Sequence, residues 1–158
     1  MQQLTPSNPP IIAIIGLGYV GLPLALAFSK HYQVIGYDLN HARVDALKKG
    51  EDTTLETDAE AIKNANHLVL TNDLAKIASA TVFIVTVPTP VNADKSPDLS
   101  FLLYASSQIA SLLKRGDIVI YESTVYPGCT EEDCVPVLEK NSGLQFNKDF
   151  YCGYSPER

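Results

Sequence analysis

The chain has 158 residues, of which 46% are hydrophobic and 19% are charged, the composition of one ordinary globular domain with a sizeable core. Intrinsic disorder and collagen-like chains are thereby excluded. The formal charge of −6 would repel a nucleic acid, and no basic cluster in the sequence offsets it.

The longest apolar stretch, residues 11–26, is interrupted by glycines and Pro23 and is shorter than the ~20 residues that a membrane span needs. Residues 1–10 lack the positive start of a secretory signal, and we expect a flexible leader there. The three cysteines have neither zinc-type spacing nor the number needed for a disulfide framework. We predict a cytoplasmic protein with no metal, membrane or nucleic-acid partner. The cysteines, which we interpret as reduced and structural, are Cys129, Cys134 and Cys152.

Short apolar runs alternate with helical segments, as is typical of a parallel sheet with crossover helices. The runs are rich in Val, Ile and Tyr without strict polar alternation, as expected for strands covered on both faces. The predicted strands are residues 11–15, 33–38, 67–71, 81–87, 117–122 and 150–154; the predicted helices are 19–30, 40–49, 58–64, 99–113 and 130–140. The pattern predicts an α/β fold with one domain over residues 11–158, a Rossmann-type doubly wound parallel sheet in three layers (αβα).

Some element boundaries carry their own signals. Asn40 can cap the second helix and Gly50 can close it, whereas Asp98 or Ser100 can cap the fourth. The proline-rich segment 88–97 directly follows a predicted strand. We therefore predict a loop at the carboxyl edge of the sheet, where ligands of open α/β sheets bind, and expect it to form one wall of a site.

The strongest motif lies between the first strand and the first helix. Gly16, Gly18 and Gly21 have the G-x-G-x-x-G spacing, in which the glycines allow a tight turn, close approach to a pyrophosphate and close helix packing. The free N–H groups around Tyr19 and Val20 would then face the phosphates. An S-adenosylmethionine site is the nearest competitor, but its glycines fall at alternate positions. We predict a dinucleotide.

Asp38 ends the second predicted strand, roughly 20 residues beyond the first glycine, where a carboxylate accepts hydrogen bonds from the adenosine ribose. Its charge would repel the extra phosphate of NADP, which favours NAD. Arg43, early in the next helix, complicates this interpretation because a nearby arginine can accommodate a 2′-phosphate. It could also contact the adenine or the ribose, or be a solvated helix charge.

Three later segments join the glycine motif in a resemblance that covers nearly the whole chain. The four motifs are Gly16-Leu-Gly-Tyr-Val-Gly-Leu-Pro-Leu-Ala25, Val87-Pro-Thr-Pro90, Glu122-Ser-Thr-Val-Tyr-Pro-Gly-Cys-Thr-Glu-Glu132 and Gly153-Tyr-Ser-Pro-Glu-Arg158. In this order they closely resemble the amino-terminal domain of the UDP-glucose/GDP-mannose dehydrogenase family.

The resemblance implies a two-step oxidation of a sugar C6 alcohol to a carboxylate with two NAD. The last two motifs look most like the branch that acts on UDP-N-acetylglucosamine or UDP-N-acetylgalactosamine for bacterial surface polysaccharides. UDP-glucose and UDP-N-acetylmannosamine remain alternative substrates. In this family a cysteine of a Gly-Gly-x-Cys segment traps the aldehyde. That segment is absent here, and none of the three cysteines is assigned to catalysis.

The resemblance also implies roles for matching residues. Thr124 is similar to the threonine that holds a water or the reacting oxygen near the nicotinamide, and Glu157 to the carboxylate that assists proton transfer or thioester hydrolysis. Without the resemblance, they would be a turn-forming threonine and a solvated glutamate. Val87 and Thr89 are expected to line the pyrophosphate and nicotinamide ribose. Glu122 and Ser123 would support the pocket, or Glu122 would be a charge at a strand end.

The family's central helix, which forms a homodimer interface, and its sugar-binding domain would lie beyond Arg158. We therefore expect this chain to bind NAD weakly and to have no turnover of its own. A protein of a different class, an NAD-sensing regulatory module, would share the glycine turn and Asp38. Such a module has no use for the Glu122-Ser-Thr124 and Ser155-Pro-Glu157 motifs.

Overall fold

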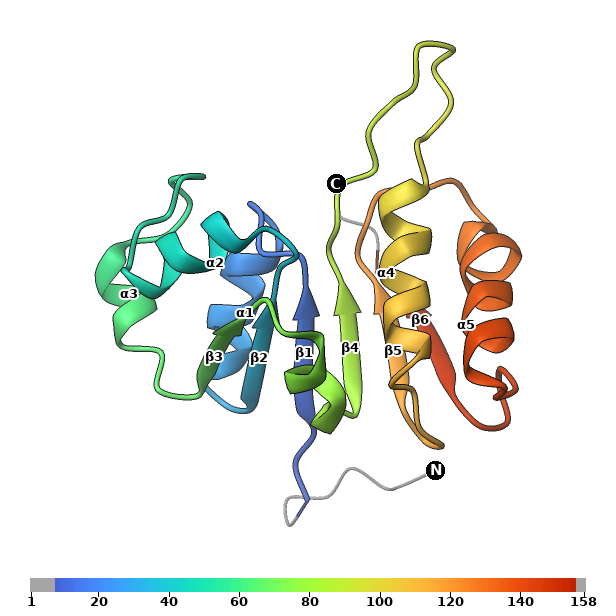
Figure 1. The fold of residues 1–158 in the computed structure, drawn as a ribbon, viewed down its shortest axis with the longest axis horizontal. Coiled ribbons are helices and arrows are strands. Elements are labelled where there is room, and N and C mark those ends of the chain that lie inside the picture. Colours follow the sequence, from blue (N-terminus) through green and yellow to red (C-terminus); the bar gives the residue numbers. More distant parts are fainter. Residues whose placement is uncertain (1–7, 156–158) are drawn as a thin grey trace.

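The computed structural model describes residues 8–155 of the chain. Within them, six parallel strands form one sheet in the order β3-β2-β1-β4-β5-β6 (Figure 1). The strands are β1 (Ile11–Ile15), β2 (Gln33–Tyr37), β3 (Leu68–Thr71), β4 (Val82–Val85), β5 (Ile118–Tyr121) and β6 (Tyr151–Tyr154). The helices are α1 (Gly21–Ser29), α2 (His41–Lys48), α3 (Ala59–Lys63), α4 (Ser100–Ala110) and α5 (Val135–Ser142), with a 3-10 helix at Leu74–Ser79 and a π-helical turn at Thr130–Cys134.

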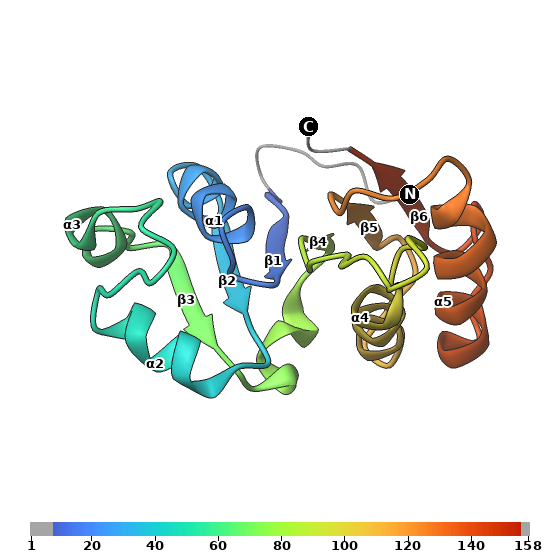
Figure 2. The ribbon, with the colours of Figure 1, turned by 90° about the horizontal axis from the view of Figure 1, so that it is seen from above.

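Successive side chains of the central strands feed two separate cores, because a strand alternates its side chains between the two sheet faces. On β1, Ile12 and Ile14 pack with α1 on one face, and Ala13 and Ile15 pack with α4 and α5 on the other. Viewed from above, α1 lies on one side of the sheet and α4 on the opposite side (Figure 2). These helices and the sheet make the three predicted layers.

The order of the strands places a crevice between β1 and β4. β1 pairs with β2 on one side and with β4 on the other, so the connections that leave β1 and β4 at their carboxyl ends turn to opposite faces. Such a switch point is where open α/β sheets bind their ligands. The loop 88–97 rises from this edge above β4 (Figure 1), and an isolated antiparallel bridge between Val91 and Pro97 closes it.

The predicted elements are confirmed in type and order, and most of their ends lie one to three residues inside the predicted bounds. β4 stops at Val85, so Thr86 and Val87 belong to the connection above the sheet. The predicted helix 130–140 begins as a π-helical turn and runs on to Ser142, where Gly143 ends it with φ of +72°. The 3-10 helix Leu74–Ser79 was not predicted. Residues 1–7 of the predicted leader lie outside the described residues.

Candidate dinucleotide-binding site

The turn after β1 is shaped by two glycines and a threonine. Gly16 has φ of +99°, a conformation that favours glycine, and its N–H donates to the Tyr37 carbonyl oxygen at 2.8 Å. The Thr86 hydroxyl donates to the Gly16 carbonyl oxygen at 2.7 Å. A Cβ at Gly21 would lie 1.8 Å from that same oxygen. Only glycine therefore lets α1 start so close to the turn.

The amino end of α1 presents free hydrogen-bond donors. The helix was predicted to start at Tyr19, and in the structure it begins two residues later, at Gly21. Among the described residues, the backbone N–H groups of Gly18, Tyr19 and Val20 have no acceptor. A Cβ at Gly18 would meet nothing within 4 Å, so the space in front of these donors is open. Free N–H groups and the positive end of a helix dipole suit a pyrophosphate.

Asp38 follows β2 and faces the glycine turn. Its Oδ2 accepts a hydrogen bond from the Leu17 N–H at 2.8 Å, and its Oδ1 accepts one from the Asn40 N–H at 2.9 Å. Each carboxylate oxygen has two lone-pair positions, so each keeps one for a ligand hydroxyl. The half-buried carboxylate is therefore fixed in place and still able to accept two hydrogen bonds from a ribose diol.

The Arg43 side chain is largely buried and is bound by protein groups. Its Nε donates to the Leu17 carbonyl oxygen at 2.8 Å, and its Nη1 contacts Asp52 Oδ1 at 2.8 Å and Thr53 Oγ1 at 2.9 Å. Burial alone would raise the pKa of Asp52, but hydrogen bonds from Thr54 and Arg43 outweigh it and lower this pKa to about 2. Arg43 thus joins the glycine turn to the segment after α2. Its contact with a cofactor stays a prediction.

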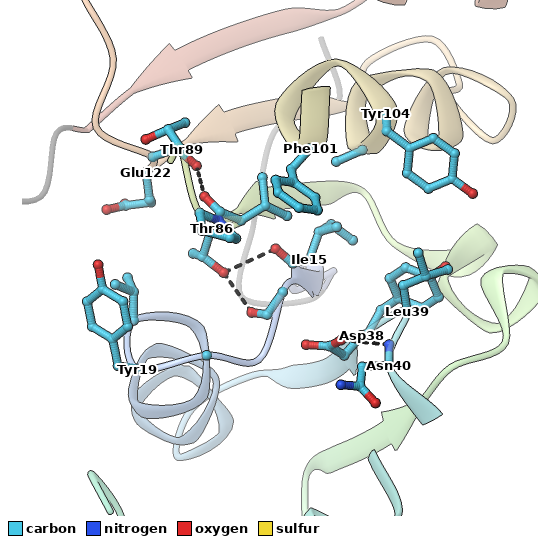
Figure 3. A pocket seen from close by; sticks show the side chains of 18 of the residues that line it. Ile15, Tyr19, Asp38, Leu39, Asn40, Thr86, Thr89, Phe101, Tyr104 and Glu122 are labelled. Carbon is cyan, nitrogen blue, oxygen red and sulfur yellow. Dashed lines mark hydrogen bonds between the residues drawn. The ribbon is translucent and has the colours of Figure 1, made fainter. Parts of the chain in front are cut away.

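A cavity of about 910 Å³ opens along the carboxyl edge of the sheet. Tyr19, Thr89 and Glu122 lie at one end of it, and Asp38 and Tyr104 lie at the other (Figure 3). Its lining consists of Ile15, Gly16, Gly18, Tyr19, Val20, Tyr37, Asp38, Leu39, Asn40, Thr86, Val87, Pro88, Thr89, Pro90, Phe101, Tyr104, Ala105, Gln108, Glu122, Ser123 and Thr124. The cavity therefore runs from Glu122 and Tyr19 past Gly16 to Asp38, an extent that fits a dinucleotide.

The loops after β4 and β5 are tied together at the end near Glu122. The Thr89 hydroxyl donates to the Thr124 carbonyl oxygen at 2.7 Å, and the Ser123 hydroxyl donates to the Val87 carbonyl oxygen at 2.6 Å. These bonds fix the Glu-Ser-Thr segment against the cavity wall. Thr124 is exposed there.

The segment after β5 is also joined to β6. The Tyr154 hydroxyl donates to the Val125 carbonyl oxygen at 3.2 Å, and the Ser155 N–H donates to the Tyr121 carbonyl oxygen at 2.9 Å. The start of the Ser-Pro-Glu motif therefore lies beside the loop that carries Thr124. Glu157 itself falls outside the described residues.

Eight of the ten predicted cofactor-binding residues line the cavity, and Gly21 and Arg43 do not. Sequence reasoning did not assign a cavity role to Thr86 or to the face of α4 that carries Phe101, Tyr104 and Gln108. For the three α4 residues, a sequence signal existed: they are three and four positions apart, so they share one face of a helix that follows the loop 88–97.

The cysteines lie away from the cavity lining. Cys129 and Cys134 are fully buried, and Cys152 is half-buried. Burial, reinforced by neighbouring cysteines, raises the pKa of Cys134 and of Cys152 to about 12. Since the thiolate is the nucleophile, these are inert, structural thiols.

Residues 8–155 contain no cluster of three or more side chains suited to a metal ion. No helix in that range is both long and apolar enough to cross a membrane. Two of the histidines bind neighbouring amides instead: the His67 Nδ1 lies 2.8 Å from the Gln33 Nε2, and His41 contacts Asn72.

The glycine turn, the carboxylate after β2 and the cavity at the switch point together define a dinucleotide-binding domain of the Rossmann class. The chain belongs to the UDP-glucose/GDP-mannose dehydrogenase family, because the model of that family's NAD binding domain matches residues 11–158. The resemblance drawn from the sequence motifs is thereby confirmed, and the cofactor of the domain is NAD.

Individual relatives agree with this assignment. The UDP-N-acetyl-D-glucosamine 6-dehydrogenase of Pseudomonas aeruginosa is 59% identical over 147 residues, which are 93% of this chain and 35% of the relative. A UDP-D-ManNAc dehydrogenase structure from Pyrococcus horikoshii superimposes with a TM-score of 0.88 at 37% identity, over 94% of this chain and 36% of that one. A GDP-mannose dehydrogenase ternary complex from P. aeruginosa superimposes with a TM-score of 0.87 at 28% identity, over 93% of this chain and 36% of that one. The chain thus spans about a third of the length of these proteins, and the predicted fold is confirmed.

Proposed function

We propose that this chain is the NAD-binding part of a UDP-sugar 6-dehydrogenase, which oxidises the sugar C6 alcohol to the uronate with two NAD in succession. The proposed substrate is UDP-N-acetylglucosamine or UDP-N-acetylgalactosamine, and the proposed setting is surface polysaccharide biosynthesis in the cytoplasm. UDP-glucose and UDP-N-acetylmannosamine are the alternative substrates. The 59% identity to a UDP-N-acetyl-D-glucosamine 6-dehydrogenase carries the choice of substrate class.

The domain's own contribution is to hold and orient the cofactor. The N–H groups of Gly18, Tyr19 and Val20 bind the pyrophosphate, and the two free lone-pair positions of Asp38 accept the adenosine ribose hydroxyls. The opposite end of the cavity, near Glu122, then receives the nicotinamide. When bound, NAD supplies the hydride acceptor for the oxidation.

The polar groups at this end are proposed to act on the substrate. Thr124 holds the reacting oxygen or a water, because it lies at the carboxyl end of β5 on the cavity wall. Glu157 is proposed to exchange a proton with the substrate, the role implied by its place in the Ser-Pro-Glu motif. The trapping cysteine belongs to the part of the enzyme outside this chain, as do the sugar contacts and the dimer interface.

Calorimetric titration of the chain with NAD and NADP tests the cofactor part of the proposal. NAD should bind more tightly, because the carboxylate of Asp38 repels a 2′-phosphate. Asp38→Ala should abolish this preference, whereas Asp45→Ala, which removes an exposed carboxylate of α2, should retain it. Equal binding of NADP by the unaltered chain would contradict the assignment.

The oxidation itself is tested in a protein that carries this domain at the length of its relatives. With UDP-N-acetylglucosamine it should form two NADH for each sugar consumed. A ratio of one would mean that the reaction stops at the aldehyde.

A further inference from the structure

One face of α4 borders the cavity, but the proposed binding of NAD assigns no contact to it. Phe101, Tyr104 and Gln108 project from it at helical spacing, and all three line the cavity. Phe101 is 50% and Tyr104 51% exposed, although large apolar side chains gain from burial. A bound molecule that covers them would therefore gain apolar contact.

The place of these residues identifies the part of the ligand that they meet. Asp38 accepts the ribose of the adenosine half, so the base joined to that ribose must lie next to Leu39 and Tyr104. Both side chains are more than half exposed, and they border the cavity on the Asp38 side, away from Glu122 (Figure 3). An aliphatic side chain and an aromatic ring form a suitable slot for a flat base.

Gln108 gives this slot a fixed hydrogen-bonding pattern. Its Nε2 donates to the Tyr104 hydroxyl at 3.2 Å and to the Tyr37 hydroxyl at 3.3 Å. The Tyr37 hydroxyl also donates to Gln108 Oε1, at 3.5 Å, so Oε1 keeps one lone-pair position as an acceptor. The Tyr104 hydroxyl hydrogen is left as a donor. An acceptor beside a donor complements the edge of adenine, where the 6-amino group donates and the adjacent ring nitrogen accepts.

We propose that Gln108 and Tyr104 form a base-reading site that selects a 6-amino purine over a 6-oxo purine in the bound dinucleotide. Gln108 Oε1 accepts from the 6-amino group, and the Tyr104 hydroxyl donates to the neighbouring ring nitrogen. A 6-oxo group would bring a second acceptor against Oε1 and leave both without a hydrogen. This inference rests on the proposed function, since it requires that the cavity binds NAD through Asp38.

The test compares the affinities of NAD and nicotinamide hypoxanthine dinucleotide, which differ in the 6-substituent of the purine and in the hydrogen that the 6-oxo form carries on N1. N7, the ring nitrogen on the edge that the site reads, is an acceptor in both. The chain should bind NAD about ten-fold more tightly, as expected for one hydrogen bond exchanged for an unpaired acceptor. Gln108→Leu should reduce the ratio to about two or less, because the acceptor is gone. Gln108→Glu should retain the preference, since a carboxylate also accepts.

Gln33→Leu is the matched control. It makes the same chemical change at the amino end of β2, where the Gln33 Nε2 lies 2.8 Å from the His67 Nδ1 and the side chain does not line the cavity. Its NAD preference should equal that of the unaltered chain. Circular dichroism of each variant separates a lost preference from a lost fold.

The outcomes separate the two proposals. Tight NAD binding with an equal affinity for the hypoxanthine analogue overturns the base-reading site and leaves the NAD site intact. An unchanged ratio in a folded Gln108→Leu variant overturns it as well. Failure to bind either dinucleotide contradicts the proposed function, and the base-reading site with it.

Discussion

Gly18 and Gly21 belong to the same motif, yet the structure gives them different physical tasks. A Cβ at Gly21 would collide with the Gly16 carbonyl oxygen at 1.8 Å and with Thr86 Oγ1 at 2.5 Å. A Cβ at Gly18 would touch nothing within 4 Å. One glycine is therefore required by the fold, and the other only by a ligand that enters the open space.

Two alanine substitutions should separate these tasks. Gly21→Ala should lower the free energy of unfolding by about 2 kcal/mol or more, since backbone must move to relieve the overlap. Gly18→Ala should change this free energy by less than about 1 kcal/mol and weaken NAD binding at least ten-fold, because the methyl group occupies the place of the pyrophosphate. Urea denaturation and calorimetric titration measure the two effects. Normal NAD affinity in Gly18→Ala would contradict the placement of the pyrophosphate.

The segment between α2 and α3 is organised by one buried carboxylate. Asp52 accepts hydrogen bonds from the N–H groups of Thr54, Glu56 and Thr57 and pairs with Arg43. Its side chain is 1% exposed. Because Arg43 also donates to the Leu17 carbonyl oxygen, it connects this segment to the glycine turn.

Asp52→Asn should destabilise the chain by roughly 3 kcal/mol at pH 7, since it leaves the buried Arg43 without its partner. The folded-state pKa of Asp52, about 2, lies below the ordinary value of 3.8. The stabilisation from its charge is therefore complete above pH ~4 and lost as the pH falls towards 2. Thermal denaturation between pH 7 and pH 2 should show a shallower acid decline for the variant.

Asp45→Asn, which changes an exposed carboxylate of α2, should leave the stability profile of the chain nearly unaltered. A decline of equal steepness in Asp52→Asn and in the unaltered chain would contradict the role given to Asp52.

Sequence patterns were sufficient to predict the strands and the helices between them, because strands that are buried on both faces appear as apolar runs that are easy to detect. The capping signals of α2 also held: the Asn40 side chain accepts from the Arg43 N–H, and Gly50 follows the helix with φ of +82°. At α4 the N-cap is Leu99 instead of Asp98 or Ser100, although the Asp98 side chain accepts from the Ser100 N–H at 2.9 Å. The orientation of Arg43 could not be predicted, since it depends on Asp52 across a loop without periodicity. For the same reason, Gln108 and Tyr37 could not be paired from positions so far apart in the chain.

At the scale of the whole molecule, NAD should stabilise the fold, because its contacts come from several elements at once. At a hundred times the dissociation constant, mass action adds about 2.7 kcal/mol to the free energy of unfolding. For a domain of this size, that corresponds to a rise in Tm of roughly 5 to 10 °C. Circular dichroism melts with and without NAD measure it. Gly18→Ala, which should bind NAD at least ten-fold more weakly, should show at most about half of this rise at the same concentration. An unchanged Tm in the unaltered chain at saturating NAD would count against the site.

The pairing of β1 with β4 also sets the order in which binding competence can arise during synthesis. A nascent chain that has emerged only as far as β3 already holds the glycine turn and Asp38, but the wall formed by Thr86, Thr89 and α4 does not yet exist. We expect such an amino-terminal intermediate to have no useful affinity for NAD. The coenzyme would then stabilise only chains in which both halves of the sheet have joined, and would not trap an incomplete fold on the ribosome.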